Sequence, residues 1–429
     1  MLRNRYWNRK IQTASAKKLK NLQLHLLKNQ LQRAYNQSRI YRRKFKHSQV
    51  KPSDIKELVD LSKIPFTSRK ELETSFRNVV SVPMARVATI RQTSGTTGTP
   101  MTVAHTLTDI ERIANASARK LTFHGITRKD IVQVTAAYGL SQGAWSMHWG
   151  LQKIQACEIP VGPGDTERQI KIAKDFGSTV LYGVTNYHLR IAEVAKQIGE
   201  DLQKTKLETA ICVSEKPTKQ QIRQMKKEIG YERIFLDYGA TEFPGFSVYC
   251  NADQEAYHVW ADYYVAEIID PETNEPVNEG EKGELVITSL QNEAFPLIRY
   301  RSRDIMTYLG YEKCSCGMCH PKIGTEIDRK DFMVKVRGAS IFPSRIEEIL
   351  AGFPEMTGRC QIVVDKRTPK QEFTLEAETN LRLNAPMQQL LKRSIQQEIK
   401  TKLRATLDNV VFVPLGNFED KMRKSITIE

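Results

Sequence analysis

The 429-residue sequence contains no run of 18 or more apolar residues, so no membrane-spanning helix is expected. It also lacks internal repeats and low-complexity tracts. The basic N-terminus, MLRNRYWNRK, is not followed by the apolar stretch of a secretory signal. The seven cysteines are an odd number, which argues against a disulfide scaffold and fits a reducing compartment. These absences predict a soluble cytoplasmic protein, and the length allows more than one domain.

Basic residues outnumber acidic ones and give a formal net charge of +16. Much of the excess lies early, in RNRYWNRK, AKKLK and YRRKFK. A solvated basic helical face is the simplest interpretation. Binding to polyanions such as phosphates or nucleic acid, or attraction to an anionic membrane surface, are the alternatives. Because the sequence has no nucleic-acid-binding motif, no nucleic acid partner is expected.

Residues 1–75 are predicted to be mainly helical. The leucines of LKNLQLHLLKNQLQRAY follow near-helical spacing, and SRIYRRKFKHS is predicted as a second short helix. KPSDIKELVDLSKIP is predicted to start a helix at Ser53 as N-cap and to end it at Pro65. FTSRKELETSF repeats the pattern, with Thr67 or Ser68 as the cap and acidic residues in the first turn.

Short β-branched segments then alternate with helical ones. ARVATIRQT, DIVQVTAA, ACEIPV, STVLYGV, TAICVSE and RIFLDYG are predicted strands, and the alternation is typical of βαβ units with a parallel sheet. From YYVAEIIDPETNEPVNEGEKGELVITSL the pattern changes to an antiparallel or barrel-like section. The predicted fold class is therefore α/β, with a large domain over residues 1–327 and a small α+β domain over residues 328–429.

Residues 92–100, QTSGTTGTP, follow a predicted strand and contain almost no side chain that can pack. Glycine permits close approach of the backbone to a ligand, and successive N–H groups with hydroxyls form an anion cradle. The stretch lacks the Gly-Lys-Ser/Thr ending of a Walker loop. By itself it is compatible with either an anion site or a flexible surface turn.

Further stretches accompany this loop in a fixed order: LDYGATEF at 236–243, RYRSRDI at 299–305, DRKDFMVKVRGASIFPSRIEEIL at 328–350 and FEDKMRKS near the C-terminus. With KIPFTSRKEL, PVGPGDTERQ and EIIDPETNEPV, they resemble the adenylate-forming superfamily of acyl-CoA synthetases, and its phenylacetate-CoA ligase branch in particular. The resemblance covers nearly the whole chain. It implies that ATP and a carboxylic acid, plausibly aromatic, give an acyl adenylate, and that coenzyme A then takes the acyl group.

Other acceptors are alternatives: an amine, a hydroxyl or a carrier protein in capsule, antibiotic or coenzyme biosynthesis. A nucleotide-binding homologue without catalysis is a third interpretation. The resemblance also allows a homodimer.

The resemblance assigns residues to each part of the site. The phosphate cradle would be formed by Thr93, Ser94, Gly95, Thr96, Thr97 and Gly98. Nucleotide contacts would come from Asp237, Tyr238, Gly239, Asp304 and Arg329, with Tyr238 on adenine and Asp304 on the ribose hydroxyls. Thr241 would bond the α-phosphate, Glu242 would hold Mg²⁺ and Lys421 would bridge the carboxylate and the α-phosphate. Asp331 would be the hinge of a mobile small domain.

The acyl pocket is the least readable part of the sequence. By resemblance it would be lined by Tyr138, Gly139, Trp145, Ser214, Glu215, Ala240 and Phe243. Its aromatic members suit an aryl or arylacetic acid, although aromatic residues are also ordinary core components.

CSCGMCH at 314–320 concentrates cysteine and histidine, and Cys250 and His258 lie upstream. Four Cys and His ligands suit tetrahedral zinc. The resemblance favours a structural Zn²⁺ site of Cys250, His258, Cys314 and Cys316, with Cys319 or His320 as a substitute. Free or oxidation-sensitive thiols on a turn are the alternative. Cys157, Cys212 and Cys360 are predicted core residues.

Three positions depart from the family pattern. Thr99 stands where many relatives have a phosphate-facing lysine. Phe332 replaces an acid after the hinge, and Asp420 replaces a glycine before Lys421. ATP binding is still expected with these departures. They put in question the rates of adenylation and of the transfer to coenzyme A.

Overall fold

The computed structural model describes residues 5–73, 76–93, 100–214, 216–329, 334–336, 339–341, 343–365, 372–381, 383–403, 405–418 and 426–428. The chain forms two compact units, one of Met1–Ser302 with Met306–Glu326 and the other of Arg303–Ile305 with Ile327–Glu429. Within the described ranges, no helix combines the length and the apolar character needed to cross a membrane.

A five-stranded parallel sheet is the centre of the first unit. Its order is β4 (Cys157–Ile159), β3 (Ile131–Val134), β5 (Val180–Val184), β6 (Thr209–Val213) and β7 (Arg233–Asp237). Strands buried on both faces need continuous apolar runs, and in β5 the first four residues, Val-Leu-Tyr-Gly, are buried. The predicted parallel sheet is confirmed.

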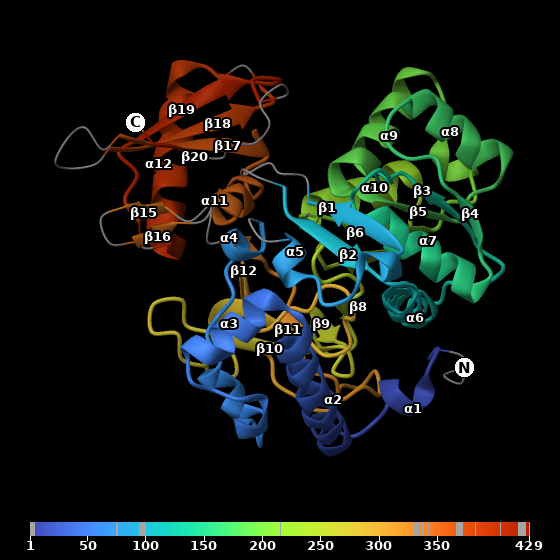
Figure 1. The fold of residues 1–429 in the computed structure, drawn as a ribbon. Coiled ribbons are helices and arrows are strands. Elements are labelled where there is room, and N and C mark those ends of the chain that lie inside the picture. The colour runs from blue at the N-terminus through green and yellow to red at the C-terminus, as the bar shows by residue number, and fades with distance from the viewer. Residues whose placement is uncertain are drawn as a thin grey trace. The chain divides into compact units, whose positions relative to one another are not determined.

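Helices cover both faces of this sheet (Figure 1). They are α6 (Leu107–Phe123), α7 (Gly143–Ile154), α8 (Thr166–Asp175), α9 (Thr185–Gln197) and α10 (Lys219–Ile229). Leu121 of α6 and Leu151 of α7 belong to one buried cluster with Val132 and Ile211 of the sheet. The α6–α7 contact depends on Gly150, because a Cβ there would lie 2.4 Å from the Cβ of Ser117.

The remaining strands of the first unit are antiparallel. They are the hairpin β1 (Thr89–Gln92) and β2 (Thr102–His105), and the sheet β13 (Lys322–Gly324), β9 (Ala256–Val259) and β8 (Ser247–Cys250). Another sheet has the order β10 (Tyr264–Ile269), β11 (Lys282–Ser289), β12 (Tyr300–Thr307) and β14 (Asp328–Arg329), of which β14 and Arg303–Ile305 of β12 belong to the second unit. The predicted barrel-like section is thus a set of open sheets. No barrel closes in the part of the chain that the structure describes, because each of these sheets ends in two edge strands.

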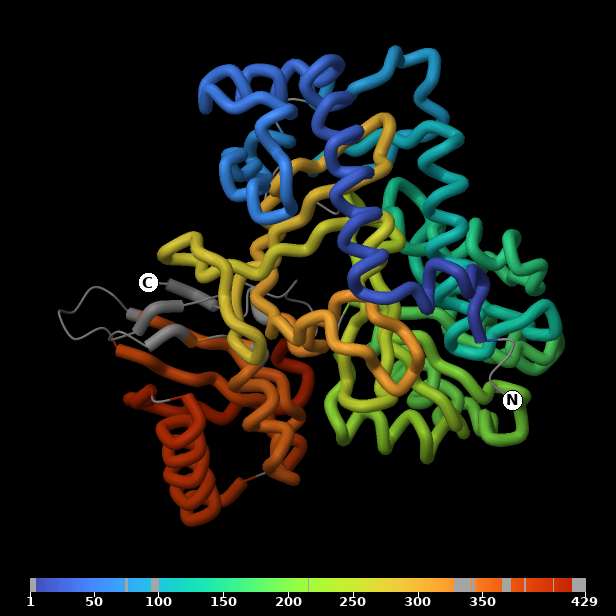
Figure 2. The backbone as a smooth tube through the Cα atoms, turned by 90° about the horizontal axis from the view of Figure 1, so that it is seen from below, coloured from blue at the N-terminus to red at the C-terminus, as the bar shows by residue number. Residues whose placement is uncertain are grey.

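The N-terminal region is helical, as predicted. It contains α1 (Arg9–Gln12), α2 (Ala16–Gln37), α3 (Arg39–His47), α4 (Arg69–Glu73), α5 (Phe76–Val79) and the 3₁₀ turn η3 (Met84–Arg86). Gln23 of α2 donates to the carbonyl of Tyr264 at 2.9 Å and accepts from Tyr311 at 3.1 Å. These bonds fix α2 to the 260–320 region, and Figure 2 shows the path of α2 across it. At α4, Ser68 is the cap, since its Oγ accepts from the N–H of Glu71 at 3.3 Å.

The segment KPSDIKELVDLSKIP is not the predicted helix. It forms two 3₁₀ turns, η1 (Pro52–Asp54) and η2 (Val59–Lys63), and Ser53 lies inside the first instead of capping a helix. The carboxylate of Asp54 accepts the Lys51 N–H at 2.8 Å, and Asp60 accepts the N–H groups of Lys56 and Glu57. Aspartates that bond nearby backbone N–H groups compete with helix formation.

The second unit is a small α+β structure. Its sheet has the order β19 (Asn409–Pro414), β18 (Glu372–Thr379), β17 (Met356–Asp365) and β20 (Ile426–Ile428). Its other elements are α11 (Pro343–Leu350), α12 (Ala385–Leu403) and the pair β15 (Val334–Val336) and β16 (Ala339–Ile341). Ile346, Ile362, Phe373 and Ile395 are among the members of its own buried core.

Two of the three predicted core cysteines are buried, Cys212 and Cys360. Cys157 is exposed, so that prediction was wrong. The reason is position: Cys157 begins β4, which is the edge strand of the parallel sheet.

His124 gives the stability of the first unit a pH dependence. Its ring stacks on Phe235 at 4.0 Å between centroids, and its Nε2 lies 3.0 Å from the carbonyl oxygen of Tyr249. Burial lowers the pKa of His124 from 6.5 to about 3, so the folded protein keeps it neutral while the unfolded chain binds a proton. The free energy of unfolding should therefore fall as pH drops from about 6.5 toward 3, by up to about 1.4 kcal/mol per pH unit. Urea unfolding at about pH 7 and pH 5 measures this. Between these two pH values, the free energy of unfolding of a His124→Phe variant should fall less than that of the unaltered chain, and an equal fall would contradict this assignment.

Candidate functional site

The carboxyl ends of the parallel strands bring the predicted loops to one edge of the sheet. Val184, Val213 and Asp237 are aligned across β5, β6 and β7, so the loops after these strands leave from neighbouring points. Open α/β sheets bind ligands at this edge. Predicted site residues that are exposed or half-buried in these loops are Ser214, Gly239, Ala240 and Thr241, and Gly139 is exposed in the loop after the neighbouring strand β3. Ser214 has φ 69°, a left-handed backbone that is uncommon for serine.

Glu242 lies in the loop after β7 and is buried, with 6% of its surface exposed. Tyr300 of β12 donates a 2.8 Å hydrogen bond to its Oε1. Arg69 of α4 donates to Thr93 Oγ1 at 3.0 Å, at the start of the predicted phosphate loop. Burial lowers the pKa of Arg69, but its bond with Glu73 and the charge of Glu242 outweigh this and hold the pKa above its ordinary value. A cation and a carboxylate therefore lie beside the entry to the loop.

Tyr238 is part of a packed aromatic cluster. Its ring centroid lies 5.4 Å from that of Tyr257, 5.8 Å from Phe246 and 6.1 Å from Phe243. Phe243 is 1% exposed, so in this structure it lies in the core and not on an open wall. Tyr238 is 8% exposed and stands at the border between this cluster and the loop that follows β7.

Tyr138 and Trp145, two predicted pocket residues, pack edge to face at 5.3 Å between centroids. Glu158 of β4 accepts hydrogen bonds from Tyr138 at 2.5 Å and from Nδ1 of His148 at 2.5 Å. Burial and the Glu158 carboxylate both raise the pKa of Tyr138, so its hydroxyl stays protonated and donates. One carboxylate thus fixes the phenol and the imidazole beside Trp145.

Strand β1 also contacts the loop that follows β3 and carries Tyr138. The N–H of Gln92 donates to the carbonyl of Leu140 at 2.9 Å, and the Arg91 guanidinium lies 4.4 Å from the centroid of Trp145. The predicted acyl pocket is therefore joined directly to the strand that enters the predicted phosphate loop.

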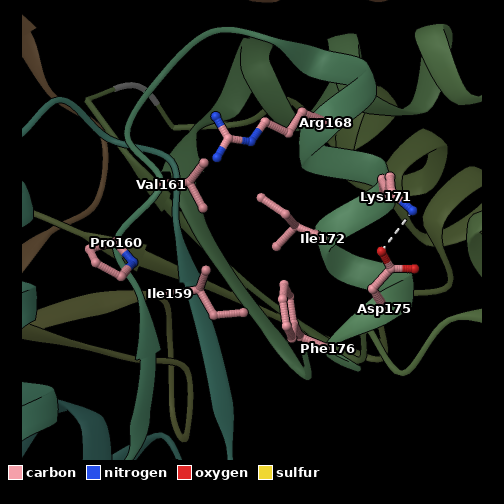
Figure 3. A pocket seen from close by; sticks show the side chains of 8 residues that line it. All are labelled: Ile159, Pro160, Val161, Arg168, Lys171, Ile172, Asp175 and Phe176. Atoms are coloured by element: carbon pink, nitrogen blue, oxygen red, sulfur yellow. Dashed lines mark ion pairs between the residues drawn. The ribbon is translucent and has the colours of Figure 1, made fainter.

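A hollow of about 450 Å³ lies between the end of β4 and α8 (Figure 3). Its apolar side chains include Ile159, Val161, Ile172 and Phe176, and the Lys171–Asp175 ion pair of 2.9 Å lies on its rim. No predicted site residue lines it. It is therefore separate from the predicted acyl pocket.

Asp304 and Arg329 meet in the second unit. They are directly opposite each other in the antiparallel pair of β12 and β14. Asp304 is 7% exposed, and the neighbouring Arg303 has φ 66°. The register thus places side by side the position predicted to bind the ribose, Asp304, and the one predicted to contact the ribose or a phosphate, Arg329.

The structure also brings the four cysteine and histidine residues together. Cys250 ends β8, His258 lies on the neighbouring strand β9, and Cys314 and Cys316 come from the turn before β13. Their ligand atoms all lie within 4.8 Å of one another, and all four residues are buried.

The distances in this cluster fit a zinc tetrahedron. Cys250 Sγ and Cys314 Sγ are 3.9 Å apart, and Cys316 Sγ is 3.5 Å from His258 Nε2. Zinc–sulfur bonds of about 2.3 Å give tetrahedral edges of about 3.8 Å. The other imidazole nitrogen, Nδ1, is 3.1 Å from the His320 carbonyl, which leaves Nε2 to face the cluster. Hydrogen bonding by Cys316 and His258 lowers the pKa of Cys250, which favours the thiolate that metals bind.

His320 does not fit the role of substitute ligand. Its Nδ1 accepts the N–H of Ala261 at 3.0 Å, and its Nε2 lies 3.2 Å from the carbonyl of Ile11. Both ring nitrogens are thus engaged elsewhere. Cys319 is half-buried and is not among the four grouped residues.

Comparison with known families identifies the chain. The family model described as AMP-binding enzyme matches residues 22–292, and the one described as AMP-binding enzyme C-terminal domain matches residues 338–428. The chain belongs to the AMP-binding enzyme family. This confirms the resemblance to adenylate-forming enzymes that the sequence motifs indicated.

Curated relatives of this AMP-binding enzyme share one name. The phenylacetate-coenzyme A ligase of Thermus thermophilus is 33% identical over 91% of this chain and 86% of its own length. The phenylacetate-coenzyme A ligase of Escherichia coli is 31% identical over 95% and 93%. Among solved structures, a 2-hydroxyisobutyryl-CoA ligase in the postadenylation state with 2-HIB-AMP has a TM-score of 0.89 at 23% identity, covering all of this chain and 93% of that one. This likeness confirms the fold.

Several predicted site residues lie outside the described residues. They are Ser94, Gly95, Thr96, Thr97, Gly98, Glu215, Asp331 and Lys421, together with the departures at Thr99, Phe332 and Asp420. For Arg329 the structure describes the backbone position in β14.

Sequence reasoning missed two features of the site in this AMP-binding enzyme. Arg69 lies in KIPFTSRKEL, a stretch that carried the resemblance but received no role. Glu158 lies in a predicted strand, and nothing local indicates that it bonds Tyr138 and His148. A basic residue in a family-like segment was the available signal for Arg69; no signal existed for Glu158.

Asp237 depends on a buried partner. Lys120 of α6 forms a 2.6 Å ion pair with Asp237, and their side chains are 5% and 13% exposed. Replacing Lys120 with methionine leaves that carboxylate buried without its cation, so unfolding free energy should fall by about 3 kcal/mol. Lys153→Met is the matched control. It removes the partly exposed Lys153–Glu111 pair and should cost less than about 1 kcal/mol. Urea unfolding measures both, and equal losses would contradict the assignment.

Proposed function

We propose that this chain uses ATP to convert a carboxylic acid to an acyl adenylate and pyrophosphate, and then passes the acyl group to coenzyme A with release of AMP. The observation that carries the proposal is the set of phenylacetate-coenzyme A ligases that are 31–34% identical to it, three of which match at least 91% of the chain. An arylacetic acid is the proposed substrate class. The packed pair of Tyr138 and Trp145 beside the sheet edge supports an aromatic acid.

The proposed nucleotide site uses the loops at the sheet edge. Residues 93–98 would cradle the phosphates, Tyr238 would contact adenine, and Thr241 would bond the α-phosphate. Arg69 joins this set, because it reaches Thr93 and lies within the field of Glu242. Fixed donors and cations placed where phosphate charge develops are the main source of rate in such a site.

Other roles remain proposals from the family. Asp304 would bind the ribose, and Arg329 would contact the ribose or a phosphate. Lys421 would bridge the acid and the α-phosphate, and Asp331 would be the hinge. Glu242 would hold Mg²⁺, which when bound offsets charge on the phosphate oxygens.

We also propose a structural zinc ion held by Cys250, His258, Cys314 and Cys316. Support comes from the tetrahedral spacing of their atoms and from the imidazole orientation set by the His320 carbonyl. The zinc ion would hold the 314–320 turn against the β8–β9 hairpin.

The cytoplasm is the proposed compartment, since none of the cysteines forms a disulfide.

Acid-dependent exchange of pyrophosphate into ATP tests the adenylation step. A panel with phenylacetate, hydroxylated arylacetates, benzoates and short aliphatic acids should give the greatest exchange with an arylacetate. Release of AMP should then require coenzyme A. Measurable ATP binding with no exchange for any acid would favour a non-catalytic homologue. AMP release with an amine or a carrier protein, but not with coenzyme A, would assign a different acceptor.

A further inference from the structure

The positive charge of this chain is concentrated in its first 53 residues. They contain 15 lysines and arginines and no aspartate or glutamate. That leaves 50 basic residues for the other 376 positions, against all 49 acidic residues of the chain. The net charge of +16 is therefore almost entirely a property of the N-terminal helices.

The folded structure presents this charge to solvent. In α3 the apolar residues Ile40, Tyr41 and Phe45 are buried, while the basic residues other than Lys44 are exposed. Exposed cations on α2, α3 and the residues that follow, here called the basic face, are Lys17, Lys18, Lys20, Lys28, Arg39, Arg42, Arg43, Lys46 and Lys51. Figure 2 shows α2 crossing the front of the first unit, with α3 continuing from its far end.

The basic face is held rigidly and is little neutralised. Gln30 donates to the carbonyl of Asn292 at 2.8 Å, and Tyr41 donates to that of Pro296 at 3.1 Å. The recorded ion pairs of the region use two half-buried cations, Lys44 with Glu71 and Arg33 with Glu293. Arg42 donates to the carbonyls of Tyr35 and Asn36, and Lys20 lies over the Tyr311 ring, while the other exposed cations of the basic face are available to a partner.

The side chains of the basic face favour a lipid surface over a nucleic acid. Tyr35 of α2 is half-buried and Tyr41 of α3 is buried, so neither phenol ring is open for base stacking, and the exposed rings of these helices are the imidazoles of His25 and His47. A hollow beside Lys28 and Lys56 measures about 210 Å³, too small for a groove. Two large apolar side chains that precede and follow these helices in the sequence are exposed, Trp7 at 40% and Val59 at 71%. Cations with flanking apolar residues are typical of interfacial segments.

We propose that the basic face docks the enzyme on the anionic surface of a phospholipid membrane. The docking is peripheral, because the described helices include none able to span a bilayer. Each lysine or arginine near such a surface contributes about fivefold to affinity. The proposal does not depend on the acid or the acceptor that the enzyme uses.

Sedimentation of the full chain with vesicles tests the proposal. At about 0.1 M salt it should bind vesicles of phosphatidylcholine with roughly 30% phosphatidylglycerol. It should not bind pure phosphatidylcholine vesicles, and binding should be lost at about 0.5 M salt. The variant R39Q/R43Q/K46Q/K51Q should lose about 100-fold or more in affinity.

A matched control removes four exposed cations from α10: K219Q/R223Q/K226Q/K227Q. It has the same net charge as the first variant and should bind like the unaltered chain. If both variants lose the same affinity for the vesicles, the binding depends on net charge alone and the proposal is overturned. The proposal is also overturned if the unaltered chain does not bind the vesicles. Tighter binding of a single- or double-stranded oligonucleotide, lost in the first variant alone, would assign the face to nucleic acid instead. ATP–pyrophosphate exchange in both variants reports folding, and its absence in all three proteins would count against the proposed function only.

Discussion

Replacing Cys314 with serine is expected to remove one zinc ion per chain and to lower the melting temperature by about 6 °C. The four ligand atoms lie within 4.8 Å of one another in a buried site, so a serine hydroxyl leaves the tetrahedron one thiolate short. Structural zinc supplies about 10–16 kcal/mol in small zinc-binding peptides. Losing roughly 4 kcal/mol of this corresponds to about 6 °C for a unit the size of the first one, at about 2 cal/mol/K of unfolding entropy per residue.

Two controls separate zinc binding from a general effect of losing a thiol. Cys157→Ser changes an exposed cysteine on β4, and Cys319→Ser changes a neighbour of the cluster that lies outside the grouped four. Both variants should keep one equivalent of zinc by atomic absorption and melt near the unaltered chain. Zinc retained in Cys314→Ser would overturn the site, and zinc lost in Cys319→Ser would reassign the fourth ligand.

The parts of the fold that sequence predicted are those with a strong local signal. The apolar β-branched run of β5 needs burial on both faces, and the leucines of α2 fall on one helical stripe, so both elements were predicted correctly. The 51–65 segment failed because Asp54 and Asp60 bond nearby N–H groups, which is a local competition that periodicity does not register. Cys157 failed because an apolar strand does not reveal its place at the sheet edge.

The candidate site also has parts that could be predicted from the sequence and parts that could not. The resemblance paired Cys314 and Cys316 with Cys250 and His258, and the structure groups these four residues although 64 residues separate Cys250 from Cys314. Contacts between common residue types could not be predicted from the sequence. The bonds that join Glu158 to Tyr138 and Arg69 to Thr93 depend on which strands and helices become neighbours, and that is decided by the fold.

A Glu242→Gln variant is expected to lose acid-dependent ATP–pyrophosphate exchange by about 100- to 1000-fold while remaining folded. The glutamine carbonyl can still accept the 2.8 Å hydrogen bond from Tyr300, so the loop after β7 keeps its anchor. What the variant loses is the negative charge proposed to hold Mg²⁺, and a neutral amide is a poor ligand for that ion.

Tyr300→Phe is the complementary variant, because it removes the hydrogen bond and keeps the carboxylate. If Glu242 acts through its charge, exchange in Tyr300→Phe should fall less than about tenfold, since a neutral hydrogen bond contributes only about 1 kcal/mol. Its melting temperature should fall more than that of Glu242→Gln, because a buried carboxylate, 6% exposed, loses a donor. Near-normal exchange in Glu242→Gln, with a large loss in Tyr300→Phe, would make Glu242 a structural acceptor for Tyr300. The charge beside Arg69 and Thr93 would then have to come from elsewhere in the site.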